Sequence, residues 1–162
     1  MNVIVAADNN WGIGYQNRLL ISIPGDLKMF KERTTGNVVV LGRKTLETFP
    51  KQKPLPNRTN IILSRDKNYT VDGAIVVHSL EELDEELKKY PSESIYIIGG
   101  DSIYKQMIDK CDTAYVTRID HTYSADAYFP NLDKDDSWEI VETGEEQTCF
   151  DISYEFVTYK RK

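Results

Sequence analysis

The sequence predicts an α/β fold: one domain with a mostly parallel central sheet of about eight strands, a C-terminal antiparallel hairpin and helices on both faces. Short β-rich runs recur along the chain, several are apolar on both faces, and stretches with helical spacing separate them. Strands that are apolar on both faces are typical of parallel sheets covered by helices. No linker, repeat or low-complexity tract interrupts the chain, so the domain is expected to span residues 1–162.

The strands of the parallel part are the short runs of β-branched and other apolar residues. They are predicted at 3–7, 38–41, 60–63, 75–77, 95–98 and 114–119. Two later strand-like runs, 138–142 and 152–159, have no helical stretch between them. Consecutive strands joined without a helix pair most simply as an antiparallel hairpin, which we expect to finish the sheet.

The helices are predicted from their start signals and apolar spacing. Ser79 and Glu82 have the spacing of a capping box, and the helix that they open carries Leu80, Leu83 and Leu87. A second helix is marked by Ile103, Met107 and Ile108. A third begins near Pro24, because the fixed φ of proline suits the first turn of a helix.

Composition narrows the classes of function. Of the 162 residues, 40% are apolar and 28% are charged, a composition that predicts a folded chain. The net charge of −6 argues against a nucleic-acid partner, because binding to phosphates needs a basic surface. No apolar run reaches the ~18 residues of a membrane span, and Met1 to Asp8 lack the features of a signal peptide. We therefore expect a cytoplasmic protein without membrane contact, in which Cys111 and Cys149 are reduced and mostly buried.

Asp26 is the most informative single residue. In a helix that begins near Pro24, it shares a face with Ile23, Leu27 and Phe30, so a carboxylate lies within an apolar stripe. Burial raises the pKa of a carboxyl group and calls for a polar partner, which includes a ligand. The alternative is a helix-start aspartate on the polar face, which the helix dipole favours.

Two strand-to-helix junctions are suited to phosphate. Residues 38–41 run into Gly42-Arg43-Lys44-Thr45, where basic side chains and free backbone N–H groups meet at a helix start. Residues 95–98 run into Gly99-Gly100-Asp101-Ser102, where glycines let a ligand approach the backbone. Each junction is also compatible with an ordinary tight turn or a solvated charged pair, because short motifs have low specificity.

Other motifs are absent or uninformative. The sequence lacks G-x-G-x-x-G, the P-loop, G-x-S-x-G and H-E-x-x-H. His78 and His121 stand far apart without cysteine or acidic residues at ligand spacing, so they are expected to be surface or hydrogen-bonded histidines, and no metal site is predicted.

An ordered set of short segments is more specific than any one of them. The set comprises Val5-Ala6, Ile13-Gly14 with Asn17, Pro24-x-Asp26-Leu27-x-x-Phe30, Gly42-Arg43-x-Thr45, Pro54-Leu55-Pro56-x-Arg58-x-Asn60, Ile98-Gly99-Gly100-x-x-Ile103-Tyr104, Thr117 and Phe129-Pro130. In this order the segments resemble the dihydrofolate reductase family over nearly the whole chain.

The resemblance implies an NADPH-dependent oxidoreductase that reduces 7,8-dihydrofolate to tetrahydrofolate, binds antifolate inhibitors and acts as a monomer. It implies that Asp26 and Thr117 are catalytic and that residues 14–23 form a lid. The implied substrate-binding residues are Ile4, Val5, Ala6, Leu19, Ile21, Leu27, Phe30, Phe49, Leu55, Arg58 and Ile98. The implied cofactor-binding residues are Ala6, Ile13, Gly14, Gly42, Arg43, Lys44, Thr45, Leu63, Ser64, Arg65, Ile98, Gly99, Gly100, Asp101, Ser102, Ile103 and Tyr104.

The chain departs from the family pattern in places. Leu20-Ile21 replaces the usual Pro-Trp before the helix, which removes an indole N–H donor. Asp101 stands where a small neutral residue is usual, and its carboxylate is expected either to cap a helix or to repel the cofactor. The usual Gly-Asp-Thr reads Ala125-Asp126-Ala127, and the segment 50–53 is a residue longer than usual.

Two other functions remain open from the sequence. One is a reductase of the same fold that acts on another pterin or on the ribosylamino-pyrimidine of riboflavin synthesis, for which Asp26 and Arg58 are not expected together. The other is a non-enzymatic nucleotide-binding domain, which would keep the Gly-Gly junction but has no need of a buried Asp26.

Overall fold

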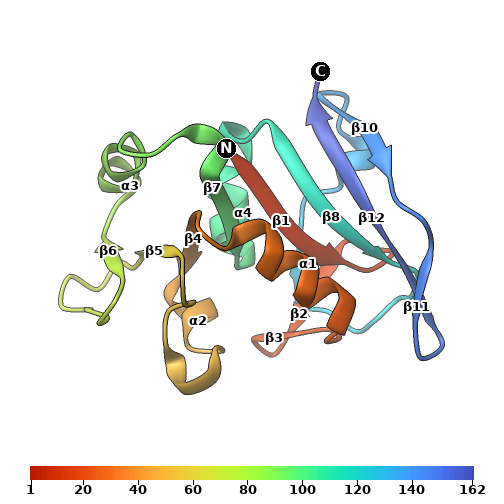
Figure 1. Ribbon diagram of the computed structural model, residues 1–162, viewed down its shortest axis with the longest axis horizontal. Helices are drawn as coiled ribbons and strands as arrows, with labels where there is room; N and C mark the ends of the chain where they lie inside the picture. The colour runs from red at the N-terminus through yellow and green to blue at the C-terminus, as the bar shows by residue number, and fades with distance from the viewer.

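A twisted sheet of nine strands organises the protein, and the computed structural model describes residues 1–162. Its strand order is β10-β12-β8-β1-β7-β4-β5-β6, and β11 pairs with β12 beside β10 (Figure 1). The pairs from β8 through β1, β7, β4 and β5 to β6 are all parallel. The strands are β1 (Asn2–Ala7), β4 (Val38–Gly42), β5 (Thr59–Leu63), β6 (Ile75–Val77), β7 (Ile95–Gly99), β8 (Thr113–Ile119), β10 (Trp138–Thr143), β11 (Gln147–Cys149) and β12 (Ile152–Arg161).

The parallel part of the sheet confirms the prediction from the sequence. All six predicted strands are present, and most of their side chains are buried on both faces. Such strands need cover on each side, which explains why their sequences are nearly continuous apolar runs. The predicted count of about eight strands agrees with the nine of the central sheet, in which β11 is the strand that the sequence did not predict.

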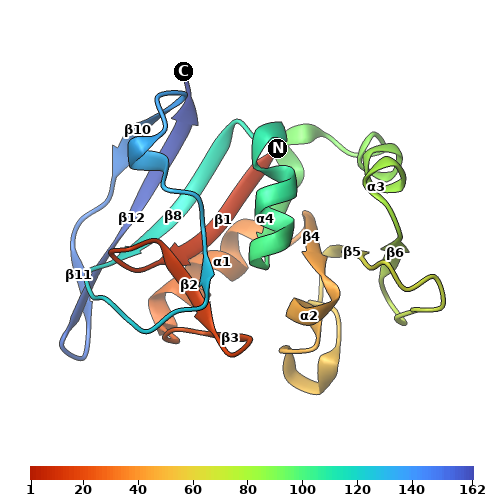
Figure 2. The same cartoon turned by 180° about the vertical axis from the view of Figure 1, so that it is seen from behind.

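Helices cover the two faces of the sheet. They are α1 (Pro24–Thr34), α2 (Arg43–Leu46), α3 (Leu80–Leu87) and α4 (Asp101–Met107), with 3-10 turns at Pro50–Gln52, Ser92–Ser94, Ile108–Lys110 and Leu132–Lys134. Helix α1 lies in front of the sheet in Figure 1, and α4 lies on the opposite face in Figure 2. Ser79 Oγ accepts from the Glu82 amide as predicted, but the Glu82 carboxylate accepts from His78, so only half of the capping box forms.

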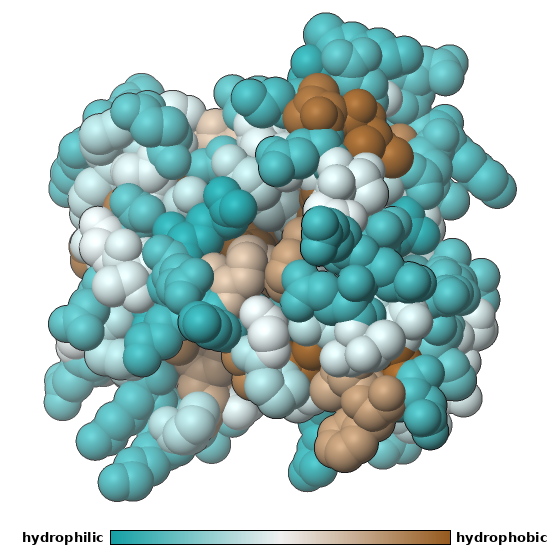
Figure 3. Space-filling model, turned by 45° about the vertical axis from the view of Figure 1, so that its right-hand side comes forward, coloured by the Kyte–Doolittle hydropathy of each residue, from teal (hydrophilic) through white to brown (hydrophobic).

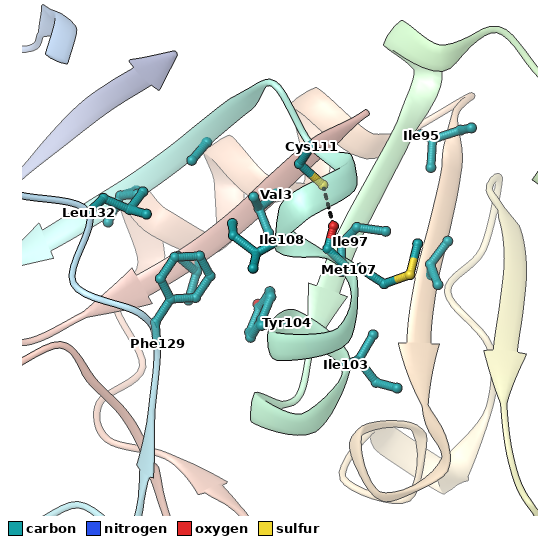
Figure 4. Close-up of a cluster of buried hydrophobic side chains, with 14 of the residues drawn as sticks. Val3, Ile95, Ile97, Ile103, Tyr104, Met107, Ile108, Cys111, Phe129 and Leu132 are labelled. Carbon is teal, nitrogen blue, oxygen red and sulfur yellow. Dashed lines mark hydrogen bonds between the residues drawn. The ribbon is translucent and has the colours of Figure 1, made fainter. Parts of the chain in front are cut away.

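Three buried apolar clusters result from this arrangement, and the two larger ones form the cores. Under α3 and α4, the largest core contains Leu83, Met107 and Phe129, and Figure 4 shows the α4 side chains facing those of β1 and β7. Under α1 and α2, a second core contains Leu46, against which Phe30 packs. The buried Cys111 thiol contacts the Met107 carbonyl oxygen, whereas Cys149 is only half-buried and both thiols are free.

The C-terminal hairpin confirms the predicted antiparallel addition. Strand β12 pairs with both β10 and β8 in antiparallel register. Ile140, Val141 and Phe150 are exposed on this hairpin. The face in Figure 3 is mostly hydrophilic and shows apolar atoms in only a few places. The four helices are too short and too polar for any of them to cross a lipid bilayer.

A second, three-stranded sheet lies at the edge of the main one and was not predicted. It consists of β3 (Arg18–Leu19), β2 (Gly12–Tyr15) and β9 (Ala127–Tyr128), in that order. Strands of two to four residues are too short to show a recognisable alternation, and β2 also contains two glycines, which weaken the strand signal. The segment expected as a free lid is therefore partly held in a sheet.

Candidate active site

The first turn of α1 places a carboxylate beside a buried hydroxyl. Pro24 begins the helix after the buried Ile23, and this puts Asp26 in the first turn. Thr117, fully buried on β8, donates a hydrogen bond from its Oγ1 to Asp26 Oδ1 over 2.6 Å. The two residues are 91 positions apart in the chain, so packing of α1 across the sheet brings them together.

The environment of Asp26 disfavours its charged form. Burial raises the pKa of the Asp26 carboxyl above its ordinary value, and the hydrogen bond from Thr117 opposes part of this rise. No Lys or Arg forms an ion pair with Asp26. A half-buried carboxylate without a cation is suited to bind a ligand that carries a proton or a positive charge.

The helix face around Asp26 does not pack into the core as a closed stripe. Ile23 is buried, but the side chain of Leu27 is 46% exposed and Phe30 is half-buried. The predicted grouping of these apolar residues with Asp26 is therefore open at one side. An apolar surface that is left open beside a carboxylate is typical of a ligand site.

Most of the other predicted substrate residues lie in the packing around this face. Phe30, Phe49, Leu55 and Ile98 pack against the core that contains Ile4, whereas Ala6 and Ile21 pack against the cluster of Ile23, Ile119 and Tyr154. Val5 lies in the core under α3 and α4, and Leu19 is 64% exposed on β3. The structure thus places most of the predicted substrate residues in or against two apolar clusters and leaves Val5 and Leu19 outside both.

Arg58 lies at the opposite end of α1 from Asp26. Its Nη1 donates to Oγ1 of the buried Thr34 at 3.0 Å, and its Nε donates to the Pro56 carbonyl at 2.9 Å. Burial lowers the pKa of the Arg58 guanidinium from its ordinary value. Asp26 and Thr34 are eight residues apart, which is ~12 Å along a helix at ~1.5 Å per residue. The site is therefore elongated, with a carboxylate at one end and a guanidinium at the other.

A cleft of about 750 Å³ lies at the carboxyl ends of β4, β5 and β6. This edge of a parallel sheet is where α/β proteins bind ligands. The predicted cofactor residues on the cleft are Gly42, Arg43, Lys44, Thr45, Leu63, Ser64, Arg65, Gly100, Asp101, Ser102 and Ile103. Six predicted cofactor residues do not line it: Ala6, Ile13, Gly14, Ile98, Gly99 and Tyr104. Ile13 and Tyr104 pack in the large core, Ala6 and Ile98 pack against the two smaller apolar clusters, and Gly14 lies in β2.

The cleft has the charge and the close backbone approach that a dinucleotide needs. Arg43, Lys44 and Arg65 put three cations on its wall. A Cβ atom at Gly100 would lie 3.4 Å from Thr45 Oγ1, and Gly99 has a φ of +118°, which glycine adopts most readily. A side chain at Gly100 would fill the space between the two predicted junctions, so the residues present fit a phosphate-bearing cofactor.

Several residues on the cleft were not predicted from the sequence. They are Asn17, Asp66, His78, Ser79, Leu80 and Gln106. Nδ1 of His78 lies 2.9 Å from the Ser64 carbonyl, so this histidine is hydrogen-bonded, as one alternative held, and also faces the cleft. His78 comes directly after β6, just as Ser64 comes directly after β5. Because adjacent parallel strands end at the same edge of a sheet, these two positions in the sequence already indicate that His78 lies beside Ser64.

Asp101 does not cap α4. The N-cap residue of this helix is Gly100, and no side chain makes a capping hydrogen bond there. The Asp101 carboxylate lies on the cleft instead, with no ion pair in the structure. Of the two expectations for this residue, the capping one is wrong.

The lid segment is tied to the loop before β9. The Gln16 amide donates to Asp126 Oδ2 at 3.0 Å, and the Asp126 amide donates to the Gly14 carbonyl at 3.0 Å. Asn17 reaches the Lys44 carbonyl and lines the cleft. Asp126 therefore ties residues 14–16, part of the segment expected to form a lid, to the loop before β9.

Substitution Asp126→Ala is expected to loosen this lid. One exposed hydrogen bond of about 1 kcal/mol is lost, so the lid opens several-fold more often and KM for both substrates rises. Amide hydrogen exchange at Gln16 measures the opening directly. Asp126→Asn, which keeps an acceptor oxygen, is the matched control; equal exchange in Asp126→Ala and the wild type would contradict the expectation.

Comparisons with known proteins agree with this geometry. A sequence model of the family described as "Dihydrofolate reductase" matches residues 1–161. The chain is 37% identical to the dihydrofolate reductase of Staphylococcus aureus (strain N315), over 90% of this chain and 86% of that protein. It is 34% identical to that of Bacillus subtilis (strain 168), over 100% and 95%.

A solved structure of similar fold is the dihydrofolate reductase from Enterococcus faecalis complexed with NADP(H) and RAB-propyl. It has a TM-score of 0.87 and 37% sequence identity, and the match covers 99% of this chain and 95% of that one. Because the match in sequence and in fold extends along essentially the full length, the chain belongs to the dihydrofolate reductase family.

Proposed function

We propose that the chain reduces 7,8-dihydrofolate to tetrahydrofolate with NADPH, and that Asp26 and Thr117 form the catalytic centre. The observation that carries the assignment of the centre is the 2.6 Å hydrogen bond between Thr117 and a half-buried, unpaired Asp26. The surrounding apolar surface holds water away, and a low dielectric strengthens the field of a carboxylate on a cationic ring.

The protein contributes orientation and charge to the reaction. Asp26 accepts hydrogen bonds from the pterin ring and stabilises its protonated form, while Thr117 fixes the carboxylate in place. The hydride comes from the nicotinamide of bound NADPH, and one proton from solvent completes the balance. Phe30, Phe49 and Leu55 line the path of the substrate between Asp26 and Arg58.

Arg43, Lys44 and Arg65 are the side chains that would bind the phosphates of NADPH, together with Thr45, Ser64 and Ser102. Gly100 leaves the backbone open to the cofactor. Asp101 adds a negative charge to the same cleft and would weaken the binding of a phosphate beside it.

The function is tested by an assay in which dihydrofolate is the substrate and the oxidation of NADPH is monitored by the loss of its absorbance. The family reaction gives turnover with dihydrofolate and little with the ribosylamino-pyrimidine. A reductase for that other substrate would show the reverse, and a nucleotide-binding domain would bind NADPH without turnover. Either of the last two results would contradict the proposal.

Arg58→Ala is expected to raise KM for dihydrofolate by about 10- to 100-fold with little change in kcat. The guanidinium is held by Thr34 and Pro56, so its remaining N–H donors are free for the substrate's glutamate carboxylate, and one charge-assisted bond is worth ~1.5–3 kcal/mol. A dihydropterin without the glutamate is the matched control, because its KM should not depend on Arg58. A similar rise for both substrates would assign Arg58 a structural role.

We also propose that residues 1–162 act as one catalytic domain and as a monomer in the cytoplasm, with antifolates bound at the Asp26 end of the site. The two free thiols are consistent with a reducing compartment. Sedimentation of the purified protein measures the oligomeric state, and an antifolate that carries a protonated ring should bind less tightly to Asp26→Asn.

A further inference from the structure

Tyr154 lies directly beneath the first turn of α1. Its side chain is 5% exposed, and it forms one apolar cluster with Ile23, the residue that precedes the helix, and Ile119. Tyr154 on β12 pairs with Ile119 on β8, two positions beyond Thr117. The ring of Tyr154 thus connects the strand that carries Thr117 to the helix turn that carries Asp26.

Gly25 is the residue of α1 that the Tyr154 hydroxyl meets. A Cβ atom built on Gly25 would overlap Tyr154 Oη, and the next atom, Cζ, would be at 3.5 Å. Gly25 has no positive φ, so its backbone conformation alone does not call for glycine. Glycine inside a helix costs ~0.5–1 kcal/mol relative to alanine. The close approach of Tyr154 is therefore the physical reason for glycine at this position.

The hydroxyl acts on the helix by contact. Its one hydrogen bond goes to Gln147 Oε1 on β11 at 3.3 Å, and it has none to Asp26. The Gln147 bond and the buried ring fix the height of Oη above the sheet. Gly25 immediately precedes Asp26, so the distance between the backbone of Gly25 and Oη sets how deeply Asp26 lies against Thr117.

We propose that Tyr154 is a positioning residue for the reaction: through its contact with Gly25 it seats the first turn of α1 and thereby holds Asp26 against Thr117. The catalytic role of Asp26 comes from the proposed function, but the seating of α1 is a property of the protein without ligands. The two ideas can therefore fail separately.

The variant Gly25→Ala tests the contact, because its methyl group must displace the helix turn or Tyr154. A longer Asp26–Thr117 distance weakens the hydrogen bond that opposes the burial effect, so the pKa of Asp26 should rise further. We expect kcat/KM near neutral pH to fall about tenfold or more, as is usual when a reacting group is misplaced. Tyr104 also interacts with the charge of Asp26. Its pKa is raised by burial and by that charge, so its hydroxyl stays neutral over the pH range in which Asp26 titrates.

The second change, Tyr154→Phe, should rescue Gly25→Ala. Without Oη the nearest atom to the new methyl is Cζ at 3.5 Å, which is an ordinary contact. The double variant should recover most of the lost kcat/KM and the wild-type pKa of Asp26. Tyr159→Phe is the matched control: Tyr159 is also a buried tyrosine of β12, but its hydroxyl contacts Asp133 and Arg118, so it should rescue nothing.

The decisive readout is the pKa of Asp26 in the cofactor-free protein, measured by carbon NMR of the carboxyl group across the four combinations of residues 25 and 154. The expected result is a rise in Gly25→Ala that disappears in the double variant. An unchanged pKa in a folded Gly25→Ala, or rescue by Tyr159→Phe as well, would overturn the proposal. If Gly25→Ala does not fold, Tyr154→Phe must restore folding, and failure to do so overturns it too. If the pKa of Asp26 changes as expected across the four proteins but the wild type does not turn over dihydrofolate, the result counts against the proposed function and not against the role of Tyr154.

Discussion

Asp26→Asn is expected to fold and to lose most of its turnover near neutral pH. Asparagine keeps the shape of the side chain and can still accept the hydrogen bond from Thr117, but it cannot carry the charge that stabilises a protonated pterin. The loss should shrink as the pH falls, because the substrate is then protonated in solution. A pH profile of kcat/KM for both proteins measures this convergence.

The matched control for this change is Glu32→Gln, which removes an exposed carboxylate from the same helix. It should behave as the wild type at every pH. Wild-type turnover of Asp26→Asn at neutral pH, or a deficit that does not diminish in acid, would remove Asp26 from the mechanism.

The same substitution should stabilise the fold at neutral pH. Because the folded state raises the pKa of Asp26, it holds the proton more tightly than the unfolded chain does. The stability that this group contributes is present below the unfolded pKa, near 3.8, and is lost as the pH rises through the folded pKa. Asparagine has no such loss, so the free energy of unfolding in urea should exceed that of the wild type at pH 7. A free energy of unfolding below that of the wild type at pH 7 would contradict the expected stabilisation.

A strong preference for NADPH over NADH is the second large effect that we expect. Arg43 and Arg65 line the cleft beside Ser64, and each charge-assisted hydrogen bond to the 2′-phosphate is worth ~1.5–3 kcal/mol, which is about a ten- to hundredfold change in affinity. Arg65 makes no ion pair in the structure, whereas Nε of Arg43 lies 3.4 Å from Glu47. Arg65→Ala should therefore lose more of the preference than Arg43→Ala.

The measurement is the ratio of kcat/KM for the two cofactors, with binding of NADP⁺ followed separately by calorimetry. Lys67→Ala removes an exposed cation that does not line the cleft, and it should leave the ratio unchanged. Equal kcat/KM for NADPH and NADH in the wild type, or an unaltered ratio in Arg65→Ala, would show that the 2′-phosphate is not bound here.

The sequence by itself determined the parallel sheet, its hairpin and the residues that follow its strands at the cleft. Short apolar runs rich in β-branched residues, such as 38–41 and 95–98, predict strands buried on both faces, and that burial requires helices on each side. The residues that follow such strands then lie at one edge, since all parallel strands end there. The position of Asp26 in the first turn of a helix also follows from local signals, with Pro24 before it.

Only the tertiary structure decided which groups meet. The Thr117–Asp26 bond joins residues 91 positions apart, and the lid bond between Gln16 and Asp126 spans 110. Local periodicity gives the face on which a side chain lies but not its partner, because the partner depends on strand order and on how a helix crosses the sheet. The contact of Tyr154 with Gly25 and the openness of the surface at Leu27 are of this kind. The sequence thus specifies the elements and the edge at which the cleft lies, while the packing of α1 on β8 and β12 decides the geometry of the Asp26 carboxylate.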